Sequence, residues 1–400
     1  MTAIDDLLRL GDDLMERSGR QPAEVFDLRI DHGDLRAEPT PQMSRHVAHQ
    51  ALMRSYQGRY VLLPSEAPGG SILAALDARY DPVATQRLDA QRAALEAELL
   101  GPAVADAKAR AAGRRCEDYV PEMLAAIRSG PGSAFLEWLT SQPSWEPHYR
   151  NFLVQSSADL LAEASASALG VVGEFGAEQS ALFRILIDEY GYGTHDKKHS
   201  VLYRRLLRGF GLNEEYNGYW PLFDTASLEL HNVIHAMFQS PRHLFRQIGF
   251  LLYAETSYQV STGEHYRFLR RHAPSVDATY FGEHAHIDIH HSRMVIDEVV
   301  APLVARFGTE VEEEVILGAE LTRAAFAAAD AHLLAVSRAF AAAVDAGAGR
   351  YARPPEGLGG HGLATPDAPG DGLVWVGGIG RLDEAAALAA FPDGATGRRV

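Results

Sequence analysis

The chain has 400 residues, of which 46% are hydrophobic, and a formal net charge of −16 at pH 7. This length suits one large domain or two to three smaller ones, and the hydrophobic share is typical of a globular protein with a buried core. The acidic balance and the lack of a basic stripe exclude the electrostatic signature of a nucleic-acid-binding protein, so we expect no nucleic-acid partner.

The sequence also carries indications of where the protein works. Cys116 is the single cysteine, so no disulfide can form within the chain, which fits a reducing cytoplasm. The first 20 residues alternate apolar and acidic side chains and have neither the basic start nor the apolar centre of a signal peptide. No run of 18 apolar residues occurs, so we expect a cytoplasmic protein without a membrane partner.

In chain order, the first clear element is a helical pattern between Pro82 and Arg110, in which Leu88, Leu95 and Leu99 recur at helical spacing. Segments rich in Gly, Pro and Ser interrupt the chain before and after it, at 64–70, 130–132 and 144–147. These breaks predict short connections between helices in the first third of the chain.

Helical segments continue almost without interruption from 148 to about 347, and the last of them, Glu310 to Ala346, is rich in alanine. Residues 351–372 are rich in Pro and Gly and predict a flexible linker, after which Leu373 to Leu382 suit a small hairpin. The sequence therefore predicts an all-α protein with three regions. These are an N-terminal helical extension (1–140), a helical core (141–347) and a flexible tail with room for a short hairpin (348–400).

Three side chains of the kinds that bind metals lie on one face of a predicted helix. In the segment YFGEHAHIDIHH, His284, Asp288 and His291 stand at i, i+4 and i+7, which aligns them at 3.6 residues per turn. The two histidines would be about 10 Å apart along the helix axis. That span is long for one ion but suits two ions roughly 3.5–4 Å apart with a carboxylate between them. Oxygen and imidazole donors without cysteine favour non-heme iron or manganese. The alternative is a solvated polar face, and His286 and His290 lie off the aligned face.

A second pair of candidates, Glu189 and His199, is separated by ten residues. Unbroken helix would place them about 15 Å apart, which is too far for one site. Gly191 and Gly193 lie between them and permit a break, so we expect Glu189 at the end of one helix and His199 at the start of the next. The alternative is an ordinary helix stop followed by a surface histidine. His195 lies within the expected break and is the weaker candidate.

Two further carboxylates, Glu163 and Glu255, each stand alone in a mostly apolar helical stretch. A buried unpaired carboxylate is destabilising and needs a metal, a partner or a proton. Glu255 is the better candidate because the preceding residues, 249–254, are wholly apolar. Considered alone, each is better explained as an acid on a solvated face or paired with arginine.

Taken together, three segments resemble the heme-oxygenase-like diiron oxidases, a family of iron-containing redox enzymes. The segments are DEYGYG with the following His199, LLYAETS (251–257) and YFGEHAHIDIHH (280–291). The resemblance covers residues 148–346, roughly half of the chain. In the family the first carboxylate helix precedes the DEYG segment by about one helical hairpin, and Glu163 lies 26 residues before Glu189, which fits. One departure is local, because many members have several glycines after DEYG where this chain has Tyr192.

The resemblance implies a bundle like that of heme oxygenase, without heme, that holds a labile pair of iron ions (Fe2+/Fe3+) and reacts with O2 as co-substrate. It also implies that the helix with the three aligned ligands is mobile and orders when iron binds, and we expect low local stability there without metal. Seven residues map onto the ligand positions of the family, with Glu189 as a bridge between the ions. They are Glu163, Glu189, His199, Glu255, His284, Asp288 and His291.

By the same resemblance, we expect a non-heme diiron, O2-dependent oxidase or oxygenase of specialised biosynthesis. It would act on a small-molecule substrate and use an external electron donor.

The first hypothesis is N-oxygenation of the amine or guanidine of an amino-acid-like substrate, with Asp188, Asp196 and Glu283 available to anchor a cationic one. The alternative within enzymes is oxidative C–C cleavage or desaturation of a fatty or amino acid, which a long apolar tunnel would favour over a polar pocket. A heme-binding oxygenase and a non-enzymatic helical partner-binding protein with a degenerate site are the further alternatives.

The N-terminal extension carries no motif that points to a function. Its helices would cap the core or form the interface of a homodimer. We expect Tyr56, Tyr60 and Trp138 to be core aromatics rather than ligand contacts.

Overall fold

The computed structural model describes residues 41–63, 71–143, 145–212, 214–216, 223–345, 373–376 and 380–383. Within these ranges the chain is helical apart from two short strands, which confirms the predicted all-α class. The strands, β1 (Leu373–Val376) and β2 (Gly380–Asp383), pair antiparallel in the segment where the sequence suits a hairpin. The predicted linker at 351–372 and the end of the predicted tail lie outside the described residues.

The described part of the N-terminal region is a series of short helices. They are α2 (Pro41–Gln57), α3 (Ile72–Arg79), α4 (Pro82–Leu99), α5 (Gly101–Ala111), α6 (Cys116–Ser129) and α7 (Ala134–Thr140). The helical pattern predicted between Pro82 and Arg110 is confirmed, and the structure divides it into α4 and α5. A new helix begins at Gly101 because Pro102 has no amide hydrogen to continue the α4 hydrogen-bond ladder and is tolerated only in a first turn.

The core region contains the longer helices of the bundle. They are α8 (Glu146–Leu160), α9 (Glu163–Gly170), α10 (Ala177–Glu189), α11 (His199–Gly209), α12 (Thr225–Phe238), α13 (Leu244–His272), α14 (Thr279–Met294), α15 (Ala301–Phe307) and α16 (Thr309–Asp345). Short 3-10 turns, η2 (Gly191–Gly193), η3 (His195–Lys197) and η5 (Pro241–His243), and one π-helix, η6 (Val295–Val300), connect or extend them. Among the described residues, no helix combines the length and the apolar character needed to span a bilayer.

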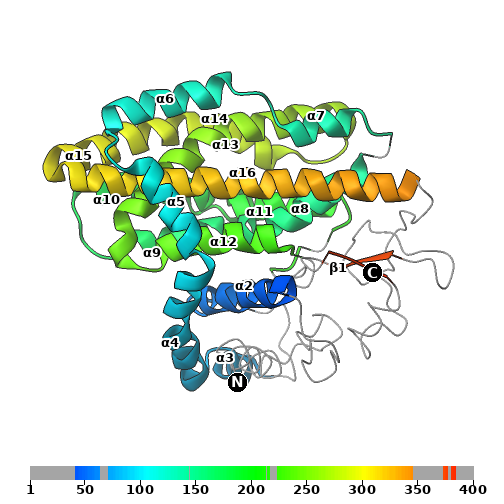
Figure 1. Ribbon diagram of the computed structural model, residues 1–400, viewed down its shortest axis with the longest axis horizontal. Coiled ribbons are helices and arrows are strands. Elements are labelled where there is room, and N and C mark those ends of the chain that lie inside the picture. The colour runs from blue at the N-terminus through cyan, green and yellow to red at the C-terminus, as the bar shows by residue number, and fades with distance from the viewer. Residues whose placement is uncertain are drawn as a thin grey trace.

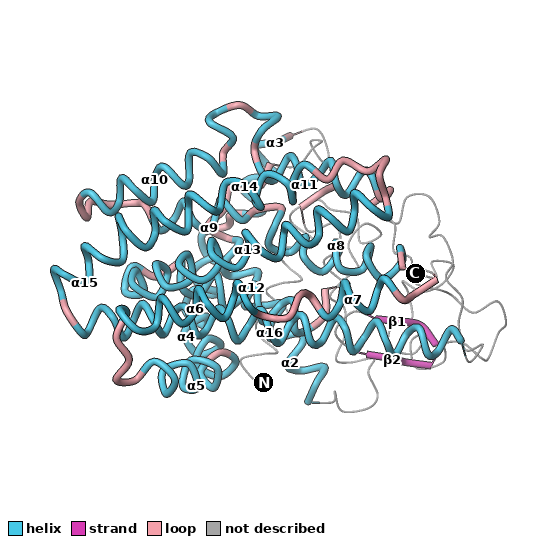
Figure 2. The backbone as a smooth tube through the Cα atoms, turned by 90° about the horizontal axis from the view of Figure 1, so that it is seen from above, coloured by secondary structure: helices cyan, strands magenta, loops and turns pink. Residues whose placement is uncertain are grey.

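Helix α13 is the centre of the bundle. It packs most extensively against α14 and α16, and Figures 1 and 2 both show it between these two helices. Glycine permits the closest approach, because a Cβ atom at Gly249 of α13 would lie 2.0 Å from the carbonyl oxygen of Val315 in α16. A Cβ atom at Gly318 would likewise lie 2.0 Å from the carbonyl oxygen of Arg246. The backbones of α13 and α16 are therefore in direct contact, which holds α13 firmly in place.

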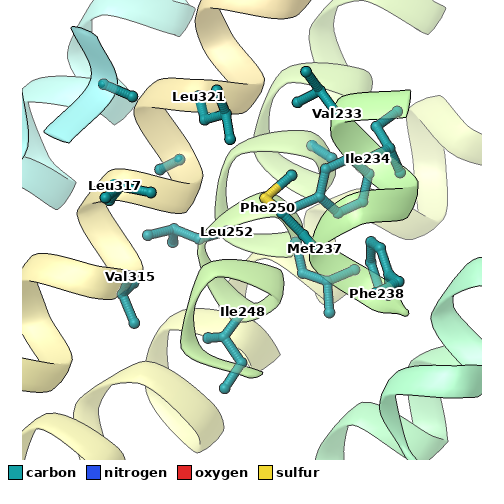
Figure 3. Packing of buried hydrophobic residues seen from close by; sticks show 14 of the residues in the cluster. Val233, Ile234, Met237, Phe238, Ile248, Phe250, Leu252, Val315, Leu317 and Leu321 are labelled. Carbon is teal, nitrogen blue, oxygen red and sulfur yellow. The ribbon is translucent and has the colours of Figure 1, made fainter. Parts of the chain in front are cut away.

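Apolar side chains from α12, α13 and α16 fill the space between these helices. Figure 3 shows Ile234, Met237 and Phe238 of α12 close to Phe250 of α13 in this cluster. Burying a side chain of this kind contributes about 1.5–3 kcal/mol. The cluster therefore fixes the relative positions of α12 and α13, which both carry residues of the sites described below.

The N-terminal helices pack directly on the bundle. Helix α2 contacts α12, α5 contacts α16, and α6 contacts α13. Figure 1 shows α2 and α4 along one side of the bundle and α6 and α7 along the other. Tyr56 and Tyr60 are buried, as predicted for core aromatics. Their hydroxyls nevertheless form hydrogen bonds, that of Tyr56 with Glu96 and that of Tyr60 with His235.

Candidate metal centre

The break between α10 and α11 positions two of the candidate ligands. Helix α10 ends at Glu189 and α11 begins at His199, as the sequence predicted. Gly191 has a φ of +64°, and a Cβ atom there would lie 2.5 Å from the backbone of Lys197. Only glycine suits both the positive φ and this close approach. The turn therefore folds back on itself and brings His199 to within 2.7 Å of Glu189, measured from Nδ1 to Oε2.

The predicted stripe of three ligands lies on α14. His284, Asp288 and His291 are buried, with exposed fractions of 3%, 0% and 0%. His286 and His290, which lie off the stripe, are exposed. The solvated-face alternative is therefore wrong for this helix. The π-helix η6 follows directly after α14, and such irregular turns are frequent at functional sites.

Glu189, His199 and His284 form a first group of potential metal ligands, with one donor atom of each within 4.8 Å of the others. His284 Nε2 lies 3.1 Å from His199 Nδ1. His284 Nδ1 lies 2.9 Å from the carbonyl oxygen of Tyr280, to which it can donate a hydrogen bond. That bond leaves the Nε2 lone pair directed into the group, which is the usual arrangement of a metal-binding histidine.

Glu255, Asp288 and His291 form the second group, again within 4.8 Å of one another. His291 Nδ1 lies 3.2 Å from Glu255 and 3.5 Å from Asp288, while its Nε2 lies 3.0 Å from Asp188. With Nδ1 toward the group, Nε2–H can donate to Asp188, so that this carboxylate orients the imidazole. Sequence reasoning missed this role and assigned Asp188 to substrate binding. The signal was its position directly before Glu189.

Glu189 reaches both groups. Its Oε2 lies next to His199, and its Oε1 lies 4.0 Å from His291 Nδ1. A carboxylate placed in this way can bridge two ions. The role of Glu189 as a bridge remains a prediction. Glu163 is the first residue of α9, and its side chain lies outside the described part of the chain, so its predicted ligand role also remains a prediction.

The buried polar atoms of the site have the chemistry of metal ligands. Within the described part of the chain, neither oxygen of the fully buried Asp288 has a hydrogen-bond partner. A buried carboxylate without hydrogen bonds is strongly destabilising unless a cation or a proton compensates it. Oxygen and imidazole donors without thiolates suit iron or manganese. The residues present therefore fit an iron site.

Protons balance the charges when no metal is bound. Burial raises the pKa of Asp288 to about 8, and repulsion from Glu255 adds to this effect. Burial alone would raise the pKa of Glu189, but the charge and hydrogen bonding of His199 bring it down to about 2. Burial disfavours the charged form of His291, yet the charge of Glu255 and contact with Asp288 raise its pKa well above its usual value. Metal binding at this site should therefore release protons.

A pocket adjoins the two groups. Glu189, Glu255 and His284 line it, and most of the remaining lining is apolar, including Leu186, Ile234, Phe250 and Leu251. The three acids that were expected to anchor a cationic substrate do not line it. Asp188 contacts His291, Asp196 is exposed and pairs with Arg205, and Glu283 is exposed. These residues lie near the ligands in sequence, but helix geometry turns them away from the pocket.

A model of the family described as iron-containing redox enzymes matches residues 150–327, the segment that contains the predicted ligands. Over this segment the chain is similar to that family. The resemblance drawn from the three sequence segments and the heme-oxygenase-like fold are thereby confirmed. The match begins within α8 and ends within α16, so the family segment includes α9 to α15 in full.

The chain is also similar to a characterised enzyme and to a protein of known structure. The nitrosourea synthase of Streptomyces achromogenes subsp. streptozoticus is 40% identical over 172 residues, which are 43% of this chain and 36% of that protein. The chain thus matches little more than a third of that relative's length. A CADD-like protein of unknown function from Nostoc punctiforme, known from a crystal structure, is 15% identical with a TM-score of 0.43. That match covers 54% of this chain and 96% of the other.

Proposed function

We propose that the chain is an O2-dependent non-heme iron oxygenase of specialised biosynthesis, with two iron ions at the candidate metal centre. The observation that carries the proposal is the position of Glu189, which contacts His199 through one oxygen and faces His291 through the other. The first group would hold one ion and the second group the other. Iron bound in this way would supply the activation of O2.

The chain's own residues would prepare the site in two ways. Asp188 accepts a hydrogen bond from His291 Nε2, which fixes the ring so that Nδ1 points at Glu255 and Asp288. The apolar wall formed by Leu186, Phe250 and their neighbours would limit the access of bulk water to the reacting groups. A dry pocket of this kind protects a strong oxidant from side reactions.

Within this class, we propose N-oxygenation of the amine or guanidine of an amino-acid-like substrate. The support is the similarity to a nitrosourea synthase, since a nitrosourea contains a nitrogen–oxygen bond. Each N-hydroxylation would consume one O2, two electrons and two protons. One oxygen atom would enter the N–O bond and the other would leave as water, so an external electron donor is required.

Gln247 is the residue best placed to orient such a substrate. It lines the pocket, it is buried, and its Nε2 has no hydrogen-bond partner among the described residues. A buried amide without a partner is costly, which makes it a ready donor to a ligand that enters the pocket. Its amide suits the carboxylate or carbonyl oxygen of an amino-acid-like molecule.

A second candidate is oxidative C–C cleavage or desaturation of a fatty or amino acid. The observation that favours it is the apolar lining, because residues such as Ile185, Leu251 and Phe238 suit an alkyl chain better than a charged one. Both reactions would use the same ligand groups and the same external donor. The two candidates therefore differ in substrate rather than in metal chemistry.

The test begins with anaerobic titration of the full chain with Fe(II). The wild type should bind about two ions at the candidate metal centre, and Asp288→Asn should bind fewer. Glu283→Gln is the matched control, since Glu283 lies on the same helix but is exposed, and it should bind iron as the wild type does. Equal binding by all three proteins would overturn the assignment of the metal centre.

The reaction is tested separately with loaded protein, O2 and a chemical reductant. Lysine, ornithine and arginine form one substrate panel, and fatty acids of graded length form the other. Mass spectrometry should find a product from the first panel that is one oxygen atom heavier. Product from the fatty-acid panel alone, shortened or unsaturated, would overturn N-oxygenation in favour of the second candidate.

A further inference from the structure

A third group of potential ligands lies apart from the two groups of the candidate metal centre. It consists of Asp159, near the end of α8, with His231 and His235 of α12, and one donor atom of each lies within 4.8 Å of the others. His231 and His235 are one helical turn apart, at i and i+4, so their rings share a face. Their ring centroids are 3.8 Å apart. Neither the sequence segments discussed above nor the proposed function uses these residues.

The geometry points to a second, mononuclear metal site in which Asp159, His231 and His235 bind one divalent first-row transition ion. Two imidazoles and one carboxylate are a known ligand set for Fe(II) and related ions, and they leave further coordination positions open. The inference concerns the residues of α8 and α12 only and does not depend on the proposed function.

The distances between the donor atoms suit a single ion. Asp159 Oδ1 lies 3.8 Å from His231 Nδ1 and 3.7 Å from His235 Nε2. Two ligands that each lie about 2.1 Å from an ion can be no more than about 4.2 Å apart. The observed separations fall inside this limit and correspond to a ligand–metal–ligand angle of roughly 125°. Only small side-chain shifts would complete the site.

The histidines are buried and lack the partners that a purely structural role would supply. His231 and His235 have exposed fractions of 0% and 1%. Within the described residues, three ring nitrogens have no hydrogen-bond partner. They are Nδ1 and Nε2 of His231 and Nε2 of His235. Leaving such a group unsatisfied destabilises the folded protein.

Tyr60 orients one of the ligands. Its hydroxyl oxygen lies 2.5 Å from His235 Nδ1. When Nδ1–H donates to the Tyr60 oxygen, the lone pair of Nε2 points toward Asp159. Metal-binding histidines commonly use their second nitrogen in this way. Tyr60 follows α2, so the N-terminal extension would contribute a positioning residue to the site.

The proposed site would open onto the pocket of the candidate metal centre. Asp159 lines that pocket together with Glu189, Glu255 and His284. Its side chain is 15% exposed, whereas the two histidines are closed off. A metal bound by Asp159 would therefore be reachable from the pocket and would have open positions for water or for a substrate group.

The test uses Co(II) and full-length protein in which Glu189→Gln and Asp288→Asn disable the candidate metal centre. This background protein should retain about one Co(II) after desalting, and Co(II) should raise its thermal midpoint. Adding His231→Gln should abolish both effects. His265→Gln is the matched control, since His265 is also buried and bonded to a tyrosine hydroxyl but lies near no carboxylate of this group.

Two milder substitutions distinguish a loss of Co(II) binding from a failure to fold. Asp159→Asn preserves shape at a partly exposed position and should lower Co(II) affinity at least 10-fold. Tyr60→Phe should lower it by about 10-fold while leaving the fold intact, as judged by circular dichroism. If the background protein binds no more Co(II) than its His231→Gln or Asp159→Asn derivative, the site does not exist.

Discussion

The contact between α13 and α16 provides a quantitative test of how the metal centre is held. In Gly249→Ala the new Cβ atom would lie 2.0 Å from the carbonyl oxygen of Val315, where ordinary contacts begin at 3.4 Å. The backbones would have to separate by roughly 1.4 Å, since neither contact atom belongs to a side chain that can rotate away. Overpacking of this kind costs about 1–3 kcal/mol and at times more.

Helix propensity acts in the opposite direction, because alanine is favoured over glycine by about 0.8–1.0 kcal/mol in a helix interior. Because the Cβ atom would meet backbone at 2.0 Å, the overpacking cost lies in the upper part of its range, and we expect Gly249→Ala to lower the free energy of unfolding by about 1–2 kcal/mol. For a domain of this size the thermal midpoint should fall by roughly 2–8 °C. Iron affinity should fall as well, since Glu255 lies on the same helix.

Gly101→Ala is the control, because Gly101 is also a helical glycine but a Cβ atom there would have no other atom within 4 Å. This substitution should leave the midpoint unchanged or raise it slightly. Differential scanning calorimetry of the metal-free proteins measures both. A midpoint for Gly249→Ala equal to or above that of Gly101→Ala would refute the close-contact argument.

The other predictions concern the site, the pocket and one capping ion pair. Asp288→Asn should raise the thermal midpoint of the metal-free protein while lowering its iron content, since it removes a carboxyl whose pKa burial raises to about 8 and which must therefore hold a proton at neutral pH. A fall in the metal-free midpoint at neutral pH would contradict this. Gln247→Leu should raise KM while leaving iron content unchanged, and an unchanged KM would remove Gln247 from substrate binding. Asp224 caps α12 through Ser227 and pairs with His332, whose pKa the hydrogen bond to Asp224 raises. Burial opposes ionisation of Asp224, but His332 lowers its pKa overall. The pair therefore stabilises most between about pH 4 and pH 6.5, and its contribution is lost above the raised pKa of His332 and below the lowered pKa of Asp224. His332→Gln should lower the midpoint more at about pH 5.5 than at about pH 9, and a loss independent of pH would exclude the ion pair as its cause.

Helical spacing and the positions of glycine in the sequence were enough to predict much of the candidate metal centre. His284, Asp288 and His291 align because the helical period is a property of the backbone, and the break at Gly191 follows from the freedom of glycine at positive φ. Even the boundary of α10 and α11 falls where the sequence placed it. The division of the helical stretch 82–110 has a local cause as well, since Pro102 cannot continue the hydrogen-bond ladder of α4.

Contacts between distant segments required the tertiary structure. Glu189 faces both ligand groups, Asp188 meets His291 across 103 residues, and Tyr60 meets His235 across 175. The spacing of His231 and His235 is visible in the chain, but the carboxylate that completes their group comes from α8. Sequence by itself determined which side chains share a helix face, because that depends on local geometry. Only packing decided which faces meet, because the close approach of α12, α13 and α16 depends on the whole buried core.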